Sequence, residues 1–216
     1  MANPVRWLWD RVRNAFARGK VDGTPGATIP DGKTLIQRDA LIQAQNVYTE
    51  RAAARLVSGK MTVNQWLTDF RVQLKVNYVQ QYMLARGGKN SMTDGDWSSL
   101  GDALKKQYEY MNRFAEEIKA GKLSEAQIKQ RMQLYFESSG AMYEQGNAKA
   151  YGVPRLPQYP GDGATICRVN CKCHWEIKPA EGGWNCSWRL GAAEHCPDCV
   201  DLAGRWNPLF VGGIAA

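Results

Sequence analysis

The sequence predicts a mainly α protein, an elongated antiparallel helical bundle with a small cysteine-rich domain at its C-terminal end. Apolar residues recur at helical spacing over most of residues 35–151 and are interrupted by glycine-containing turns. The composition then changes abruptly, because residues 152–163 contain three prolines and three glycines. All six cysteines lie between Cys167 and Cys199. These three observations define a helical body and a chemically different C-terminal part.

The overall composition is typical of a soluble globular chain. Hydrophobic residues make up 44% and charged residues 23% of the 216 residues. No run approaches the roughly 18 uninterrupted apolar residues of a membrane span. Near the N-terminus, Arg6, Asp10 and Arg11 interrupt every apolar run that could serve as a signal peptide. We therefore expect a protein that is made in the cytoplasm and does not enter a membrane.

Residues 1–20 are predicted to form an N-terminal amphipathic helix. Their apolar residues fall at helical spacing, and five basic residues against one acidic residue give a net charge of +4. Such a helix is suited to contact a protein, DNA or a membrane surface. Residues 21–34 follow as a Gly/Pro-rich arm, in which glycines and prolines oppose regular structure.

Residues 35–151 are predicted to contain the four long helices of the bundle. Thr62 with Gln65, and Ser124 with Gln127, have the spacing of capping boxes that begin the second and fourth helices. Glycines after the preceding helices supply the expected C-terminal caps. In chain order, the predicted helix ends and starts fall near Ser58, Thr62, Gly87, Thr93, Gly121 and Ser124.

Residues 152–163 are predicted to be a Pro/Gly linker, and residues 164–216 a compact Cys/Trp-rich domain. Four of the eight tryptophans lie in this domain. So short a segment buries too little apolar surface to be stable alone, so a bound metal is the expected supplement. Clustered cysteines in a reducing compartment are typical of metal binding. We therefore predict a zinc-stapled domain, meaning a domain that a structural Zn²⁺ holds together.

The candidate metal ligands fall into two halves. Cys196-Pro-Asp-Cys199 forms a tight turn that directs two thiolates at one ion, and a usual zinc-loop length separates it from the earlier half, Cys167, Cys171 and Cys173. A tetrahedral site needs only two ligands from the earlier half. The predicted set is Cys167, Cys171, Cys196 and Cys199, with Cys173 as a substitute for Cys167 or Cys171.

Three neighbouring residues are interpreted as non-ligands. Cys186 lies alone between two tryptophans, which is typical of a residue that packs in a core. His174 and His195 each adjoin a cysteine, and we interpret them as flanking residues, with coordination as the alternative.

The sequence offers little material for catalysis. Both histidines of the chain adjoin cysteines, and no glycine motif for phosphate binding is present. A site of four thiolates is typically closed and structural, whereas catalytic zinc keeps an open position. We expect the protein not to be an enzyme.

The two cysteine segments resemble a known family. Residues 170–173 (Asn-Cys-Lys-Cys) and residues 194–204 (Glu-His-Cys-Pro-Asp-Cys-Val-Asp-Leu-Ala-Gly) resemble the C-terminal element of tailed-bacteriophage minor head proteins, the head morphogenesis proteins similar to Mu protein F. In that family, a Cys-Pro-x-Cys segment pairs with an Asn-Cys-Arg-Cys segment at the end of a long helical region. The resemblance covers residues 167–204.

The resemblance implies a structural phage virion protein of the head or head–tail junction, located in the virion and in the host cytoplasm during assembly. Its implied partners are the portal protein, the major capsid protein or both, with possible contact to packaged DNA, within a symmetric assembly. The alternative is a nucleic-acid-binding zinc-knuckle protein. The charges weigh against this alternative, because residues 160–216 carry five basic and six acidic side chains.

Overall fold

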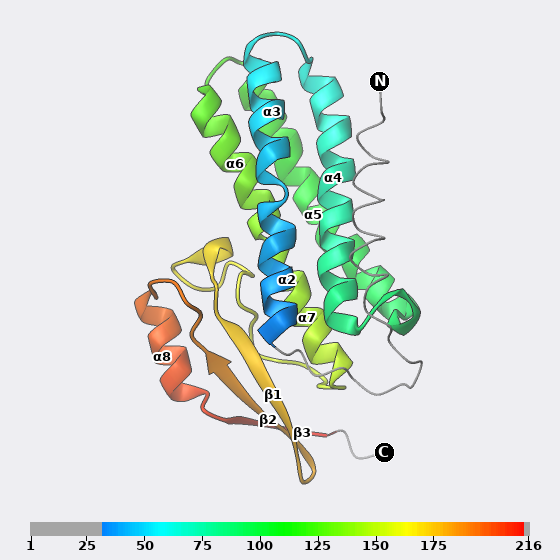
Figure 1. The fold of residues 1–216 in the computed structure, drawn as a ribbon, viewed down its shortest axis with the longest axis vertical. Coiled ribbons are helices and arrows are strands. Elements are labelled where there is room, and N and C mark those ends of the chain that lie inside the picture. Colours follow the sequence, from blue (N-terminus) through cyan, green and yellow to red (C-terminus); the bar gives the residue numbers. More distant parts are fainter. Residues whose placement is uncertain (1–31, 214–216) are drawn as a thin grey trace.

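The computed structural model describes residues 32–213, which form a helical bundle with a small sheet-containing unit at one end (Figure 1). The predicted helix at residues 1–20, and the predicted arm as far as residue 31, lie outside the described part. The first described helix begins at Gly32, so the arm ends slightly earlier than expected. The elements are α2 (Gly32–Gln43), α3 (Asn46–Val57), α4 (Val63–Arg86), η1 (Lys89–Ser91), α5 (Asp94–Lys119), α6 (Glu125–Glu137), α7 (Gly140–Ala150), η2 (Arg168–Asn170), β1 (His174–Ala180), β2 (Gly183–Arg189), α8 (Pro197–Arg205) and β3 (Leu209–Gly212).

Four helical segments run alternately in opposite directions along the bundle (Figure 1), which confirms the predicted fold class. Both predicted capping boxes are formed. The Thr62 hydroxyl accepts a hydrogen bond from the Gln65 backbone N–H (3.2 Å), and the Ser124 hydroxyl accepts one from the Gln127 backbone N–H (3.3 Å). Within the described residues, no helix is both long and apolar enough to cross a bilayer.

Two of the expected helices are each divided by a break. The first segment is interrupted between α2 and α3, and the fourth between α6 and α7. At the second break, Ser138 Oγ donates to the Tyr135 carbonyl (2.7 Å) and Ser139 Oγ donates to the Phe136 carbonyl (2.6 Å). Hydroxyls that bond to preceding carbonyls compete with the helical hydrogen bonds and bend the chain.

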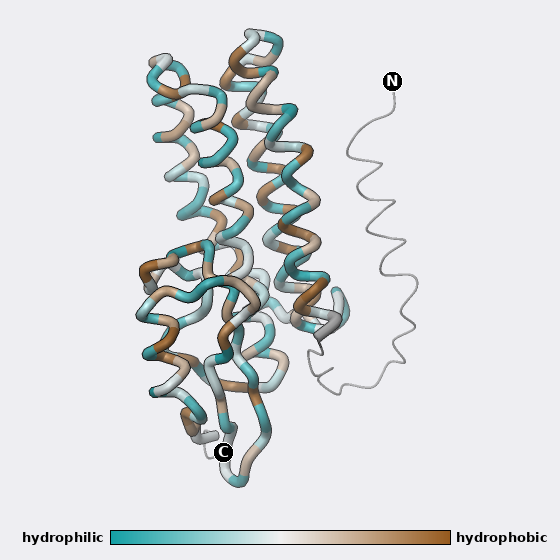
Figure 2. The backbone as a smooth tube through the Cα atoms, turned by 60° about the vertical axis from the view of Figure 1, so that its left-hand side comes forward, coloured by the Kyte–Doolittle hydropathy of each residue, from teal (hydrophilic) through white to brown (hydrophobic). Residues whose placement is uncertain are grey.

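The core of the bundle is built around α4. Trp66, Phe70 and Leu74 on this helix are completely buried. Trp66 packs edge-on against Phe114 of α5, and Phe70 packs edge-on against Phe136 of α6, with ring centroids 5.3 Å apart in both pairs. Hydrophobic and hydrophilic residues alternate along the helices (Figure 2), as expected for helices that bury one side.

Helices α4 and α7 approach each other closely at Gly146. A Cβ atom at this position would lie 2.9 Å from the Tyr82 carbonyl oxygen and 3.0 Å from the Ala85 Cβ atom. Only a residue without a side chain fits here unless the helices shift. The close contact fixes α7 against α4, and α7 in turn contacts β1.

The C-terminal unit is an antiparallel sheet with the strand order β1-β2-β3, and α8 contacts β2. Ile177 of β1 lies opposite Cys186 of β2. The rings of Trp175, Trp188 and Trp206 meet in the middle of the unit, with centroid distances between 5.3 and 6.0 Å. This tryptophan cluster is the centre of a second hydrophobic core.

Residues 152–163 pack as part of the C-terminal unit rather than as a free linker. Val153 and Leu156 are buried in the second core, which also includes Ala148 of α7. The Trp175 indole N–H donates a hydrogen bond to the Gln158 carbonyl (3.0 Å). This proline- and glycine-rich segment therefore contributes two side chains to the second core.

Two glycine-to-alanine variants test the packing of the bundle. Gly146→Ala places a Cβ atom against Tyr82 and Ala85, and we expect it to lower the free energy of unfolding by about 1–3 kcal/mol. Gly101→Ala is the matched control, because no atom lies within 4 Å of a Cβ at this exposed position of α5. The control should raise the free energy of unfolding by about 0.5–1 kcal/mol. Urea unfolding measures both, and effects of the same sign would contradict the close contact.

Asp96 is a buried carboxylate in the first turn of α5. It accepts hydrogen bonds from the Tyr82 hydroxyl (2.7 Å), from Arg86 Nε (3.1 Å) and from the Thr93 backbone N–H (2.9 Å). Burial by itself would raise the pKa of Asp96, but these hydrogen bonds and the Arg86 charge outweigh burial and lower the pKa below its ordinary value. The ionised form is therefore the form that stabilises the fold.

Asp96→Asn should remove an acid-sensitive contribution to stability. Because the folded-state pKa is lowered, the carboxylate stabilises the fold above the ordinary pKa of 3.8, and this stabilisation is lost as the pH falls through the folded-state pKa. At neutral pH, the variant should be less stable than the wild type by about 1–3 kcal/mol. The difference should shrink in acid. Urea unfolding at a series of pH values measures it, and a difference that does not change with pH would refute this account.

Candidate metal centre

The clustered cysteines come from three places in the C-terminal unit: the η2 turn, the chain just before β1, and the N-terminus of α8. Cys167 and Cys171 flank η2, and Cys173 immediately precedes β1. Cys196 and Cys199 lie at the N-terminal end of α8. Arg168 in η2 has φ 49°, a left-handed conformation that is rare outside glycine. The Asn170 N–H donates to the Cys167 carbonyl (3.0 Å), which closes the turn between the first two cysteines. Pro197, at the first position of α8, starts the second turn.

The thiols of Cys167, Cys171 and Cys199 form a triangle. Cys199 Sγ lies 3.6 Å from Cys167 Sγ and 3.6 Å from Cys171 Sγ, and all three sulfur atoms lie within 4.8 Å of one another. Sulfurs bound at about 2.3 Å to a tetrahedral zinc ion are about 3.8 Å apart. All six cysteines are free thiols. The triangle therefore has a spacing that is compatible with a shared metal ion.

Cys196 and Cys173 lie beside the triangle. Cys173 is buried in the second core together with Cys199, and Cys167, Cys171 and Cys196 pack against that core. Neither Cys196 nor Cys173 belongs to the three-thiol group. The structure thus gathers all four predicted ligands and the substitute. The ligand set itself, Cys167, Cys171, Cys196 and Cys199 with Cys173 as a substitute for Cys167 or Cys171, stays a prediction.

The close thiols alter one another's pKa values. The hydrogen bond between Cys171 and Cys173 raises the pKa of Cys171 and lowers the pKa of Cys173, and burial raises the pKa of Cys199. Burial also opposes ionisation of Cys196, but backbone N–H groups of Cys199 and Cys167 outweigh it and lower the pKa of Cys196. Neighbouring thiols therefore cannot all ionise easily without a cation. A bound metal ion supplies the missing positive charge.

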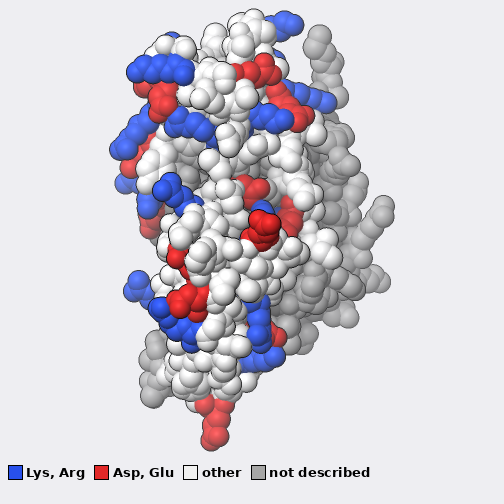
Figure 3. Space-filling view, turned by 90° about the vertical axis from the view of Figure 1, so that its left-hand side faces the viewer, with Lys and Arg blue, Asp and Glu red and all other residues white. Residues whose placement is uncertain are grey.

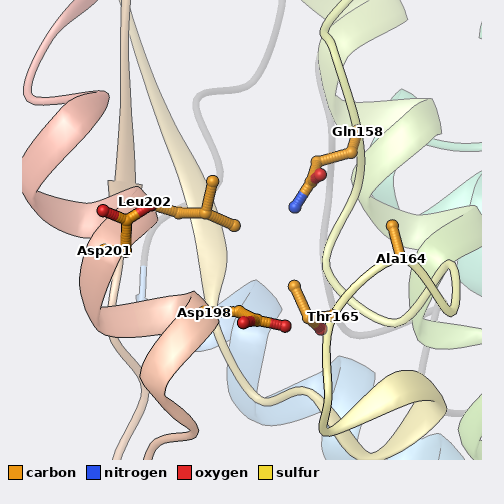
Figure 4. A pocket seen from close by; sticks show the side chains of 6 residues that line it. All are labelled: Gln158, Ala164, Thr165, Asp198, Asp201 and Leu202. Atoms are coloured by element: carbon orange, nitrogen blue, oxygen red, sulfur yellow. The ribbon is translucent and has the colours of Figure 1, made fainter.

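The loop before Cys167 is held against α8. The Ile166 N–H donates to the Asp198 carboxylate (2.8 Å), and Thr165 Oγ1 lies 3.2 Å from Cys167 Sγ. A pocket lies between this loop and α8 (Figure 4), and Asp198 in its wall is already engaged by the hydrogen bond from Ile166. The pocket is lined by Gln158, Ala164, Thr165, Asp198, Asp201 and Leu202.

A buried network connects the cysteine centre to the bundle. Arg38 Nη1 of α2 donates to Glu144 Oε1 of α7 (3.0 Å) and to the Cys173 carbonyl (3.3 Å). The other carboxylate oxygen of Glu144 accepts the Trp175 backbone N–H (3.0 Å), and Asn147 Nδ2 donates to the Trp175 carbonyl (3.5 Å). Burial raises the pKa of Glu144 to about 7, against the opposing effects of Arg38 and the Trp175 N–H. Side chains of α7 thus satisfy the β1 backbone where it meets the bundle.

Sequence reasoning missed Arg38 and Glu144. No motif or spacing marks either residue. The one available signal is that Glu144 is the only charged residue among residues 141–148, which is a weak indication of burial. Its partner in α2 lies 106 positions away and has no sequence signature.

The residues interpreted as non-ligands lie outside the three-thiol group. Cys186 is completely buried in β2 and faces the second core, which agrees with its interpretation as a packing residue. Burial lowers the pKa of His174, which begins β1. Neither His174 nor His195 belongs to the group of metal-ligating side chains identified among the described residues.

No protein-family model, curated protein or solved structure matches the chain. Function is therefore inferred from the cysteine centre, from the fold around it and from the resemblance of the two cysteine segments.

Metal content tests the centre directly. We expect purified protein to carry about one metal ion per chain. Cys199→Ser should lose the ion, because Cys199 contacts both other thiols of the triangle. Cys186→Ser is the matched control, since Cys186 lies in the same unit but outside the triangle, and it should keep the ion. Elemental analysis of the two variants measures this.

Removal of the ion from the wild type should disorder the C-terminal unit more than the bundle. Chelation should therefore abolish the near-UV circular dichroism of the tryptophan cluster and leave most of the far-UV helical signal. Wild-type protein that carries no metal and pairs its cysteines as disulfides would contradict the assignment of a metal centre.

Proposed function

We propose that this protein is a structural component of a tailed-bacteriophage virion, a minor head or head morphogenesis protein of the head or head–tail junction. One observation supports the proposal above others. The two cysteine segments that resemble the paired motif of that family lie together, with Cys171 Sγ 3.6 Å from Cys199 Sγ across 28 positions of sequence. A paired motif requires this proximity.

We further propose that the bound metal is a structural Zn²⁺ held by Cys167, Cys171, Cys196 and Cys199. Thiolates select zinc over harder divalent cations, and a site with four protein thiolates leaves no open position for substrate. The ion would join η2 to α8, which carry the two halves of the motif. Its chemistry would be limited to holding these segments together.

Apolar side chains exposed beside the thiols support a role in protein contacts. Ile166 precedes Cys167 and is 66% exposed, and Val200 follows Cys199 and is 53% exposed. The turns that direct the thiols inward leave these neighbours outward. We propose that these groups contact another protein, such as a portal or capsid protein.

The charges give less support to nucleic-acid binding by the C-terminal unit. Four of the five basic residues among residues 164–213 form ion pairs with carboxylates, and positive and negative side chains are intermixed on the face that Figure 3 shows. Contact with packaged DNA is therefore a role for the basic residues 1–20, outside the described part. The pairs are Lys172–Glu137, Lys178–Glu176, Arg189–Glu176 and Arg205–Asp201.

Genetic complementation in a phage whose genome encodes this chain tests the function. Mass spectrometry should detect the protein in purified virions, and deletion of its gene should give defective heads by electron microscopy. The wild type and Gly101→Ala should restore infectious particles, whereas Cys199→Ser should not. Normal particles at full titre in the absence of the protein would overturn the proposal, as would a phenotype confined to DNA replication or transcription.

A further inference from the structure

We propose that the fourth ligand position of the metal centre is exchangeable, and that either Cys196 or Cys173 can fill it. The inference rests on the proposed zinc site and concerns which thiolates complete it. Five thiols converge where a tetrahedral ion takes four. The structure therefore contains one thiol more than the ion needs.

The triangle of Cys167, Cys171 and Cys199 is common to both arrangements. Its sulfurs lie within 4.8 Å of one another, so one ion above the triangle reaches all three. The fourth ligand must then approach from the side of the ion away from the triangle. Cys173 is buried with Cys199 in the second core, and Cys196 packs against the same core. Both remaining thiols therefore lie beside the triangle, although neither belongs to it.

The two competing thiols lie in different surroundings. Cys196 is partly exposed and occupies the N-cap position of α8 without a side-chain capping hydrogen bond. Cys173 is 1% exposed, and its carbonyl accepts the hydrogen bond from Arg38. With Cys196 bound, the ion holds both cysteines of the α8 turn. With Cys173 bound, the ion is attached to the segment that the bundle network holds, and the Cys196 thiol is released at the surface.

Cysteine variants of the full chain, loaded with Co²⁺, test the exchange. Co²⁺ takes tetrahedral thiolate sites, and its visible absorption reports how many thiolates surround it. We expect Cys196→Ser and Cys173→Ser each to keep four-thiolate absorption, with an affinity no more than about 100-fold below the wild type. The double variant should show three-thiolate absorption. Cys186→Ser is the control and should match the wild type, while far-UV circular dichroism checks that each variant is folded.

The outcomes distinguish the proposed ligand exchange from the proposed zinc site. If one single variant keeps four thiolates and the other does not, the ligand set is fixed and the exchange is overturned, although the zinc site stands. If the wild type binds no metal, both proposals fail.

A second measurement on the wild type avoids the risk that a variant misfolds. Metal-loaded protein is treated with N-ethylmaleimide, and the labelled cysteines are mapped by mass spectrometry. Exchange predicts labelling at Cys196 while the metal is retained, because Cys173 then holds the ion. Metal-loaded protein in which Cys196 stays unlabelled would overturn the exchange.

Discussion

The buried carboxylate of Glu144 is the contact on which the relation between the two parts of the molecule depends. A carboxylate without exposed surface costs several kcal/mol unless its oxygens are paired. One carboxylate oxygen of Glu144 accepts a hydrogen bond from the Arg38 guanidinium, and the other accepts one from the Trp175 backbone N–H. Helices α2 and α7 and strand β1 therefore cannot separate without leaving a buried charge unpaired. The same guanidinium holds the Cys173 carbonyl, so a bundle residue positions one of the clustered cysteines.

Each part is held together by a different kind of interaction. The bundle has a continuous apolar core around α4, in which large aromatic rings bridge the helices. The C-terminal unit has a smaller core around three tryptophans. Val153 and Leu156, from the segment that precedes this unit, also pack in this core. A core of this size needs a further constraint. The converging thiols lie where a metal ion would supply it, between η2 and α8.

The proposed role in assembly concerns the exposed apolar side chains beside the clustered cysteines. The turns that direct cysteines inward leave Ile166 and Val200 outward, so the proposed contact surface lies beside the cysteine cluster. The Arg38–Glu144 network joins that centre to the bundle. A partner bound at the centre would thus be attached to a rigid helical support. In the proposed exchange, the ion would be bound either by both cysteines of the α8 turn or by Cys173, whose carbonyl accepts a hydrogen bond from Arg38.

The local features of this protein can be predicted from its sequence. Helix starts at Thr62 and Ser124 follow from hydrogen bonds within one turn, and the membership of the cysteine cluster follows from close spacing. The capping boxes involve neighbours in the chain, whereas the cysteines of the two segments meet across 28 to 32 positions and are recognised in the sequence by their residue type and spacing. Three features depend on the tertiary structure: the breaks within two helices, the burial of Val153 and Leu156, and the pairing of Arg38 with Glu144. No local pattern records these features, because each depends on how separate segments of the chain meet.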